Sequence, residues 1–362
     1  MKKYMVVVVI ILSVFTVLAI GLEFSNTQKP KADLLLPAEG IPEAGISKEE
    51  LMKLIESAKV EKFFDPTGKF DEAKLRNFTS PVMVVVKKLK AKGYSDEEIV
   101  EILKKYNMGY DPKTGATWIG RTPTPEELEK LPPRKYPFKD ASTTAKPEEE
   151  KIPSLPPRKY PFKDVSTTPG LEQRNAVMEV AYPQFRGINN KMKPGSLAVK
   201  EGESLFHVAT THVGRGGNWT EVGVIRSVND YRWQLFTYDD DEGGYCFHGT
   251  TSADVFNNYI IYVYPNYNKH LYNIWIDGNW VRQGCLPYLE NSVDQANEVW
   301  SGSFRFTSDT NSAVHKEPFL YIGDTAIWWD ESVLTRWWRH VEVCETHYID
   351  GSAWRFTTWV CP

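Results

Sequence analysis

The C-terminal part of the chain, residues 171–362, has a residue pattern that restricts it to one class of fold. Short runs rich in Val, Ile, Tyr, Trp and Phe are broken there by Asn, Gly, Asp and Pro. Such runs are typical of strands separated by turns. At this spacing they predict a mainly β fold, an antiparallel double-sheet sandwich or jelly roll. The predicted strands are Leu205–Thr211, Trp219–Val228, Arg232–Tyr238, Tyr259–Tyr264, Leu271–Ile276, Asn297–Thr307, Phe319–Ile322 and Trp354–Val360.

One turn in this region has a specific sequence signal. Asp277 and Gly278 lie between the strand that ends at Ile276 and the pair Asn279 and Trp280. Asp-Gly is a preferred pair for the two-residue turn of a hairpin, because both positions need a positive φ angle. We therefore expect a β-hairpin here.

The first residues of the chain predict export. Met1 to Lys3 form a basic start, and the 18 residues from Met5 to Leu22 are almost wholly apolar and carry no charge. That length is near the lower limit for a membrane span and slightly long for the core of a signal peptide. Residues 1–22 are therefore interpreted as a cleaved signal peptide or an uncleaved transmembrane anchor, and either one makes the protein secreted or cell-surface. Residues 23–46 are polar and contain proline, which predicts a tether.

Residues 47–120 predict a small all-α unit. Ser47 to Glu50 and Ser95 to Glu98 each have the sequence of a capping box, in which a serine and a glutamate three residues later close the first turn of a helix. Apolar residues follow both boxes at helical spacing. Between them, a helix from Pro81 through Leu89 is expected to end at Gly93. The unit contains no histidine and no cysteine, so we expect it to pack or dock rather than catalyse.

Residues 121–170 are rich in Pro, Lys and Glu and contain an internal repeat. Leu131–Asp140 has the sequence LPPRKYPFKD, which recurs 24 residues later as Leu155–Asp164. Two copies are too few to stack into a solenoid. This density of proline favours extended polyproline spacers. A stiff linker is one interpretation, and a docking segment with Tyr-Pro-Phe anchors is the other.

The charge and cysteine content narrow the class of protein further. A net charge of -4 gives no reason to expect a nucleic-acid partner. All four cysteines and all seven histidines lie beyond residue 200, so the two halves differ in kind. Cysteines in an exported domain predict disulfides, for which we favour the pairs Cys246–Cys285 and Cys344–Cys361. A zinc site made from all four is the competing interpretation, but no pair has the short C-x-x-C spacing.

The familiar motifs for cofactors and metals are missing from the sequence. There is no Walker A loop, no nucleophile elbow and no H-E-x-x-H sequence, so we expect no cofactor and no metal. His207 and His212 are five residues apart, which in a strand puts them on opposite faces. The acidic run from Asp239 to Glu242 can be a calcium site or a solvated turn, and the neighbouring glycines favour the turn.

Two glutamates remain as the candidate catalytic residues. On a strand, Trp219, Glu221 and Gly223 share one face, and in the same way Glu298 shares a face with Trp300 and Gly302. A glycine on that face leaves room for a substrate. If the two carboxyl groups approach each other, one becomes a carboxylic acid and the other a carboxylate. Such a pair activates a water molecule and protonates a leaving group, and it can attack peptide or glycosidic bonds.

Several stretches, in order, resemble the neprosin family of glutamic peptidases, which are related to the fungal glutamic peptidases. Thr220–Gly223 resembles the family's Ile-Glu-Ala-Gly strand, and Asn297–Val299 is similar to its Gly-Gly-Glu-Ile segment. Four other matches lie between these two segments: Leu235–Tyr238, Gly244–Cys246, Asn273–Trp280 and Leu286–Leu289. The second of these has its last two residues in swapped order, and Glu298 lacks the double glycine. The matches cover about residues 201–306.

The resemblance implies a concanavalin-like sandwich with a substrate cleft across one concave sheet. It implies that Glu221 and Glu298 are the catalytic pair of an acid-favoured glutamic endopeptidase acting on peptide or protein substrates. A non-catalytic carbohydrate- or protein-binding module and a glycoside hydrolase stay open as alternatives. The helical unit can act as a pro-segment, a docking unit or a spacer. The predicted substrate-binding residues are Trp219, Gly223, Tyr238, Trp275, Trp300 and Gly302.

Overall fold

The computed structural model of the chain describes one long N-terminal stretch and most of the strands that follow. The described residues are 32–129, 131, 172–181, 185–195, 205–215, 218–227, 232–240, 244–266, 269–286, 292–301, 313–322, 325–329, 336–339, 343–350 and 353–360. The predicted signal or anchor at residues 1–22 and both copies of the repeat, apart from Leu131, lie outside them. No helix among the described residues is long and apolar enough to cross a membrane.

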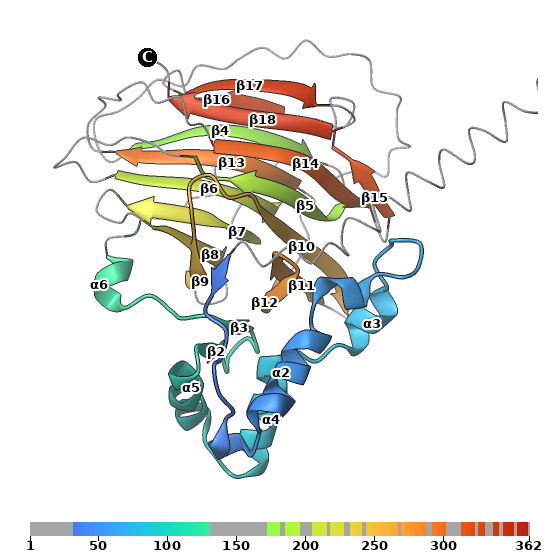
Figure 1. Cartoon of the computed structure of the whole chain (residues 1–362), viewed down its shortest axis with the longest axis vertical. Coiled ribbons are helices and arrows are strands. Elements are labelled where there is room, and N and C mark those ends of the chain that lie inside the picture. Colours follow the sequence, from blue (N-terminus) through green and yellow to red (C-terminus); the bar gives the residue numbers. More distant parts are fainter. Residues whose placement is uncertain are drawn as a thin grey trace, which may run out of the picture.

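Two antiparallel sheets form a sandwich, as the strand texture predicted (Figure 1). The first sheet contains, from edge to edge, β1 (Asp33–Leu34), β9 (Cys246–Thr251), β8 (Trp233–Asp239), β7 (Asn218–Ser227), β6 (Leu205–Arg215), β13 (Ser292–Ser301), β4 (Glu172–Ala181) and β16 (Arg336–Arg339). The second contains β17 (Val343–Asp350), β18 (Ala353–Val360), β14 (Ala313–Ile322), β5 (Phe185–Lys193), β10 (Asn257–Asn266), β11 (Lys269–Ile276), β12 (Asn279–Leu286), β3 (Thr117–Ile119) and β2 (Met108–Tyr110), with β15 (Thr325–Trp328) on β14.

A hydrophobic core fills the space between the sheets because the strands alternate. On β7, Val222 and Val224 are buried in this core, so Glu221 and Gly223 face the other way. The second sheet contributes Ile188 from β5 and Ile261 from β10, which lie opposite each other and are both fully buried. Each sheet therefore has an inner face that makes the core and an outer face whose environment decides its role.

The predicted hairpin is confirmed. Asp277 and Gly278 connect β11 to β12 with φ angles of 48° and 80°, the left-handed geometry for which Asp-Gly is suited. The predicted strand Asn297–Thr307 is shifted, because β13 begins at Ser292 and ends at Ser301, and residues 302–312 lie outside the described part. The short strand β9 was not predicted, since its sequence Cys-Phe-His-Gly-Thr-Thr contains only one large apolar residue.

Of the five α-helices described in the N-terminal stretch, the three longest form where the sequence predicted them, and the two short ones, residues 72–77 and 125–128, were not predicted. The five are α2 (Lys48–Ser57), α3 (Glu72–Asn77), α4 (Pro81–Ala91), α5 (Asp96–Lys105) and α6 (Pro125–Leu128), with 3-10 turns at Pro42–Ala44 and Val60–Phe63. Ser47 accepts a hydrogen bond from the Glu50 amide, and Ser95 with Glu98 makes the full capping box. Helix α4 ends close to Gly93, whose φ is 90°.

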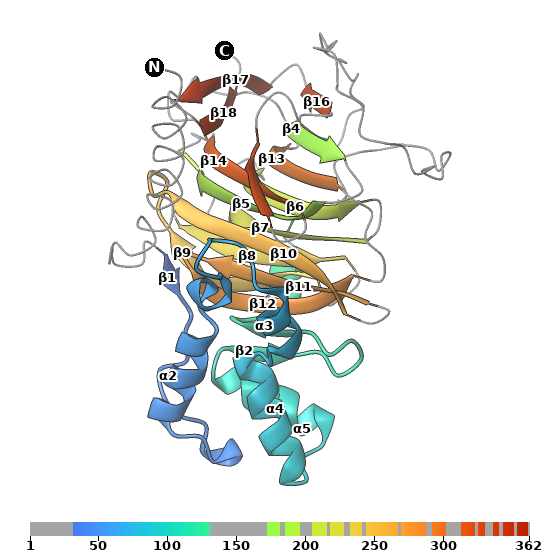
Figure 2. The same ribbon diagram turned by 90° about the vertical axis from the view of Figure 1, so that its right-hand side faces the viewer.

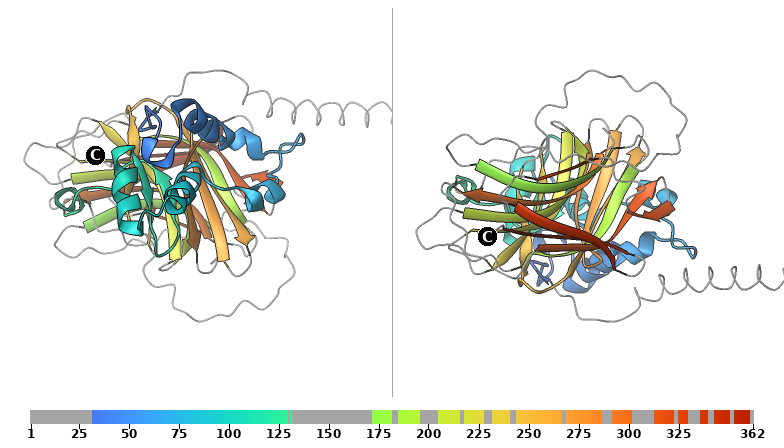
Figure 3. Two further views of the ribbon diagram at one scale, coloured as in Figure 1. Left: turned by 90° about the horizontal axis from the view of Figure 1, so that it is seen from below. Right: turned by 90° about the horizontal axis from the view of Figure 1, so that it is seen from above.

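These helices are part of the sandwich rather than a separate unit. Helices α2 to α5 gather at the end of the molecule where β11 and β12 lie, as Figure 2 and the axial views in Figure 3 show. Their apolar faces pack on the outer face of the second sheet, where they bury a set of aromatic residues: Tyr262, Tyr264, Trp275, Trp280 and Tyr321. The indole nitrogen of Trp275 donates to the Ala58 carbonyl over 2.9 Å.

Short strands of the same N-terminal stretch extend both sheets. β1 pairs with β9 at the edge of the first sheet, and β3 pairs with β12 in the second. Gly249 of β9 makes the first pairing possible: a Cβ there would lie 1.9 Å from the carbonyl oxygen of Asp33, and its φ is 144°. The predicted boundary between a helical unit and a β unit therefore does not separate two independent cores.

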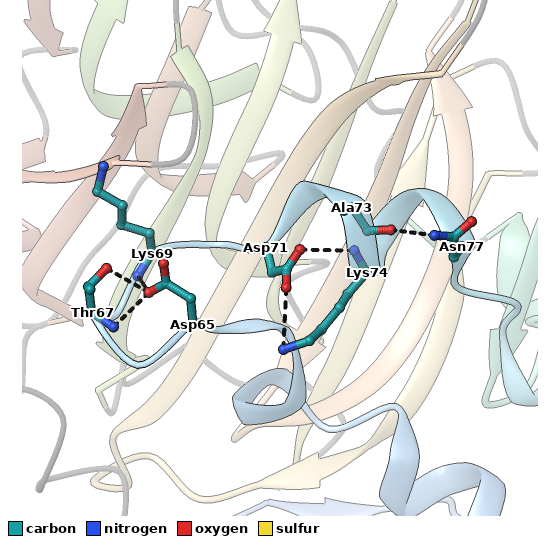
Figure 4. A network of polar contacts seen from close by, with 7 residues as sticks. All are labelled: Asp65, Thr67, Lys69, Asp71, Ala73, Lys74 and Asn77. Atoms are coloured by element: carbon teal, nitrogen blue, oxygen red, sulfur yellow. Dashed lines mark hydrogen bonds and ion pairs between the residues drawn. The ribbon is translucent and has the colours of Figure 1, made fainter.

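A network of polar contacts holds the loop before α3 (Figure 4). The Asp65 carboxylate accepts hydrogen bonds from the amide and hydroxyl of Thr67, both over 2.7 Å, and from the amide of Lys69 over 3.0 Å. These hydrogen bonds hold the pKa of Asp65 below its usual value, and the one from the Thr67 hydroxyl has the largest effect. Phe70 follows directly and stacks on Tyr262 with ring centroids 4.1 Å apart.

The predicted Cys246–Cys285 disulfide is wrong. Cys246 is a free thiol in β9 opposite Thr237, whose hydroxyl contacts Arg282 across the core. Cys285 lies opposite Leu271, which packs on the outer face of the second sheet. The two cysteines therefore occupy different layers, because Cys285 alternates with the core residue Leu286. The other predicted pair stays a prediction: Cys344 is in the β17–β18 hairpin, and Cys361 lies outside the described residues.

Candidate active site

Glu221 lies on the outer face of the first sheet, in the middle of strand β7. Its register partners are His212 on β6 and Tyr238 on β8. The carboxylate is fully buried, and so is the imidazole of His212. A buried carboxylate costs several kcal/mol unless other groups compensate it, so its contacts decide its state.

Two groups on β6 compensate the Glu221 carboxylate. Nε2 of His212 lies 2.5 Å from its Oε2 atom, within the distance of an ion pair. The Thr210 hydroxyl donates to the same oxygen over 3.2 Å and is also 3.1 Å from the Val222 carbonyl. Since Thr210 and His212 are two residues apart on one strand, the alternation of β6 delivers both to Glu221.

A row of aromatic side chains lies beside this carboxylate. The rings of Trp219 and His212 meet edge to face with centroids 5.1 Å apart, and Trp219 is also 5.1 Å from Tyr238. Tyr238 contacts Tyr245 in turn, again at 5.1 Å. Trp219 and Tyr238 were predicted as substrate-binding residues, and the structure brings both to the Glu221 side of this face. The buried aromatic rings lower the local dielectric around the carboxylate.

Glu298 is on the same face but not on a neighbouring strand. β6 lies between β7 and β13, and Glu298 is in register with Val208 whereas Glu221 is in register with His212. In a flat sheet, two strands and four residues correspond to about 10 Å across and about 13 Å along, or roughly 16 Å between the α-carbons. The carboxyl groups therefore reach a common water only if both side chains lean over the row between them.

That intervening row consists of small residues. Gly223 on β7, Thr210 on β6 and Ala296 on β13 lie in register with one another, halfway between the levels of Glu221 and Glu298. Two of the three have no side chain beyond a methyl group. The predicted role of Gly223, to leave room on this face, agrees with its place in the row. These three residues form a flat, buried floor between the levels of the two glutamates.

The register also places an acidic residue that the sequence analysis missed. Asp294 of β13 lies opposite His212, at the level of Glu221. His212 and Thr210 were missed as partners of Glu221 too. His212 had been considered only with His207 as a metal ligand pair, and the alternation of β6 confirms that these two histidines are on opposite faces. The alternation of residues 205–215 shows that Thr210 and His212 share a strand face. The sequence does not show which strand pairs with this one, so it could not place them beside Glu221.

One predicted binding residue belongs elsewhere. Trp275 is on the second sheet, fully buried beneath the N-terminal helices, so its assignment to the substrate site is wrong. The reason is that its strand, β11, is in the opposite layer from β7. Trp300 of β13 is in register with Phe206 on the face of Glu298, and Gly302 lies outside the described residues.

The structure offers little for a metal ion in the part it describes. Among the described residues, no group of three or more His, Cys, Asp or Glu side chains is placed to hold one. Asp239, the first residue of the acidic run, is buried as the last residue of β8. Residues 241–243 lie outside the described part.

Comparisons with known proteins do not show a family for this chain. Neither the protein-family models nor the curated proteins give a match to this chain. Solved structures with a similar arrangement include scytalido-glutamic peptidase with a transition state analog inhibitor, with a TM-score of 0.37 and 8% identity over 51% of this chain and 98% of that one.

Two further structural neighbours are a second peptidase and a glucanase. SCP-B, a member of the Eqolisin family of peptidases in complex with the tripeptide Ala-Ile-His, has a TM-score of 0.36 and 7% identity over 51% of this chain and 98% of its own. A prokaryotic β-1,3-1,4-glucanase from a mouse hindgut metagenome has a TM-score of 0.24 and 14% identity, covering 38% of this chain and 74% of that one. The structural neighbours thus include glutamic peptidases and jelly-roll glucanases, and function has to be argued from the residues.

Proposed function

We propose that this protein is an exported glutamic endopeptidase that hydrolyses peptide bonds under acidic conditions, with Glu221 and Glu298 as its catalytic residues. The observation that carries the proposal is the state of Glu221. It is a buried carboxylate, bonded to an imidazole and a hydroxyl, at the edge of a floor of small residues on a sheet face that Glu298 shares. Structural glutamates on a strand seldom have such an environment.

The chemistry needs one water molecule and two carboxyl groups. A carboxylate removes a proton from the water as its oxygen attacks the peptide carbonyl carbon. The protonated partner stabilises the resulting oxyanion, and the proton taken from water then passes to the leaving amine nitrogen as the C–N bond breaks. His212 is a positioning residue here, since it holds the Glu221 carboxyl through Oε2.

The surroundings favour an extended peptide. The floor made by Gly223, Thr210 and Ala296 runs across three strands. Trp219 and Tyr238 line one side of it and provide contact area for an apolar side chain. Export is part of the proposal through the apolar residues 5–22, as is docking through the two repeats, Leu131–Asp140 and Leu155–Asp164.

The test is proteolysis of an unfolded protein substrate across acidic pH by Glu221→Gln and Glu298→Gln. We expect each variant to lose a factor of about 100 or more in kcat/KM, because each removes one partner of general acid–base catalysis. Glu61→Gln, on an exposed helical turn, is the matched control and should keep full activity. If either single variant at the proposed site keeps wild-type activity, the pair is not the catalytic machinery.

Glycoside hydrolysis is the second candidate, and one observation favours it. Inverting glycosidases keep their two carboxyl groups about 6.5–9.5 Å apart, and the offset between Glu221 and Glu298 suits a wide gap better than a narrow one. Release of reducing sugar from β-glucans, without proteolysis, would favour it. A purely sugar-binding role is weakened, because Trp275 and Trp280 are buried beneath the helices.

A further inference from the structure

A cluster of buried polar residues lies between the two sheets, directly behind the strand that holds Glu221. Its members are Thr211 on β6, Gln295 on β13, Asn190 on β5 and His315 on β14, and each is fully buried. Thr211 and Gln295 are cross-strand neighbours in the first sheet. Asn190 and His315 belong to the second sheet, so the cluster crosses the core of the sandwich.

The hydrogen bonds within the cluster fix one tautomer. The imidazole of His315 is hydrogen-bonded to the backbone of Ala296. In the neutral ring this leaves Nδ1 to accept a hydrogen bond from Asn190. The side-chain amide of Asn190 donates to Nδ1 of His315 over 2.7 Å and to the hydroxyl of Thr211 over 3.5 Å. Both amide hydrogens of Asn190 are thereby used, and burial lowers the pKa of His315 to about 3, which keeps the ring neutral.

Three polar atoms of the cluster have no hydrogen-bond partner in the part of the chain that the structure describes. They are Oε1 and Nε2 of Gln295 and Oδ1 of Asn190. Leaving a buried amide atom without a partner costs about 1–3 kcal/mol, so three of them in one place would remove a large part of a domain's net stability. Native proteins avoid this cost by placing ordered water at such positions.

The geometry brings these atoms into one neighbourhood. Gln295 lies opposite Thr211, at a separation of about 5 Å between Cβ atoms for such pairs. The Asn190 amide contacts that same threonine from the other sheet. A molecule between Gln295 and Asn190 would therefore find two acceptor oxygens and one donor nitrogen, close to the three hydrogen bonds that a buried water usually makes.

The chemistry of the cluster excludes a cation as its occupant. Its four side chains are amides, a hydroxyl and a neutral imidazole, with no carboxylate among them. The free donor of Gln295 would also point a positive end at any cation. An anion would meet two carbonyl-type oxygens. Water is the small molecule that can donate to both oxygens and accept from the nitrogen.

We propose that Gln295 and Asn190 form a binding site for at least one structural water between the sheets. The water ties β13 of the first sheet to β5 of the second, and Asn190 of β5 also bonds to Thr211 of β6. It sits behind Thr211, whose chain neighbours Thr210 and His212 both hold Glu221 on the opposite face. The site thereby fixes the strand on which the Glu221 contacts depend. This inference stands on the buried amides alone and is independent of the proposed peptidase activity.

A high-resolution crystal structure of the full chain is the first test. We expect electron density for a water within hydrogen-bond distance of the Gln295 amide and of Oδ1 of Asn190. Direct bonding of the two amides to each other, or an interior with no density between them, would overturn the proposal.

The second test is thermal unfolding of Gln295→Met, which has a similar volume but no polar atoms. If water satisfies the amide, this variant loses the water bridge and leaves Asn190 unpaired, and Tm falls by about 2–4 °C. A dry, unpaired Gln295 predicts the opposite sign, because removing its polar atoms would raise Tm. Oxygen-17 relaxation dispersion should show at least one long-lived water fewer in Gln295→Met, with Gln283→Met as the control that keeps the wild-type number.

Discussion

The two outer faces of the sandwich obey the same alternation rule and end in opposite roles. On the second sheet, outward residues such as Trp275 and Tyr262 are aromatic and lie beneath the N-terminal helices. On the first sheet, outward residues of the central strands include Glu221, whose carboxylate contacts both His212 and Thr210. Both faces carry tryptophan, so the residue type does not separate a packing face from a site. The two faces differ in that the first sheet has a buried carboxylate among its aromatic rings, with polar side chains in contact with it.

The largest expected difference between the two faces is in stability. Trp275→Ala should lower the free energy of unfolding by about 3–5 kcal/mol, because it removes a fully buried ring and leaves a cavity under the helices. Urea denaturation measures this. In the fraction that stays folded, KM should remain at the wild-type value.

Trp219→Ala is the matched change on the other face. It should raise KM, since the ring lines the candidate site beside Tyr238. If Trp275→Ala instead raises KM while stability is kept, the second sheet carries the binding site and the comparison of faces is reversed.

The next effect concerns the partner of the buried carboxylate. His212→Leu removes the imidazole that lies against the buried Glu221 carboxylate, and we expect a loss of about 3 kcal/mol at neutral pH. The loss should shrink at acidic pH, where the carboxyl takes up a proton. Adding Glu221→Gln to His212→Leu should restore part of the stability, and a double-mutant cycle measures the coupling. Strict additivity would show that the two side chains do not interact.

A third prediction concerns the junction between the N-terminal stretch and the first sheet. Nδ1 of His248 on β9 bonds to the Ile119 carbonyl at the end of β3, and its Nε2 bonds to the Thr237 hydroxyl. Burial is the main reason that the pKa of His248 is lowered from 6.5 to about 3. Between these values the unfolded chain binds a proton that the folded chain does not.

The sign of the pH effect follows from that difference. Stability is complete above about pH 6.5 and falls as the pH is lowered towards 3, by about 1.4 kcal/mol per pH unit for this residue. In His248→Gln, the slope of unfolding free energy between pH 6 and pH 5 should be shallower by about that amount. Equal slopes in both proteins would mean that His248 is protonated in the folded state.

The smallest effect is expected at the edge of the first sheet. Gly249→Ala places a methyl group against the Asp33 carbonyl and should detach β1, at a cost of about 1–2 kcal/mol for its two backbone pairs. Faster hydrogen exchange at residues 33–35 would report the detachment, with exchange at β7 unchanged. Wild-type protection of β1 in this variant would show that the edge tolerates the methyl group.

Periodicity and turn chemistry in the sequence were sufficient for the mainly β class, the Asp277–Gly278 hairpin and the helix starts at Ser47 and Ser95. These features depend on a few neighbouring residues, so local rules apply to them. The sequence failed at Cys246–Cys285 and at Trp275 for a common reason. Assigning a residue to a layer requires knowing which strands pair, and pairing is decided by contacts between residues far apart in the chain.

For the candidate site, the sequence by itself determined that Glu221 shares a strand face with Trp219 and Gly223, since a strand alternates with a period of two. Only the tertiary structure decided that β6 separates β7 from β13, that His212 and Thr210 meet the Glu221 carboxylate, and that Glu298 lies four residues along from its level. The reason is physical: the fold sets the order and register of strands to bury both inner faces at once, and the contacts of every outward residue follow from that choice.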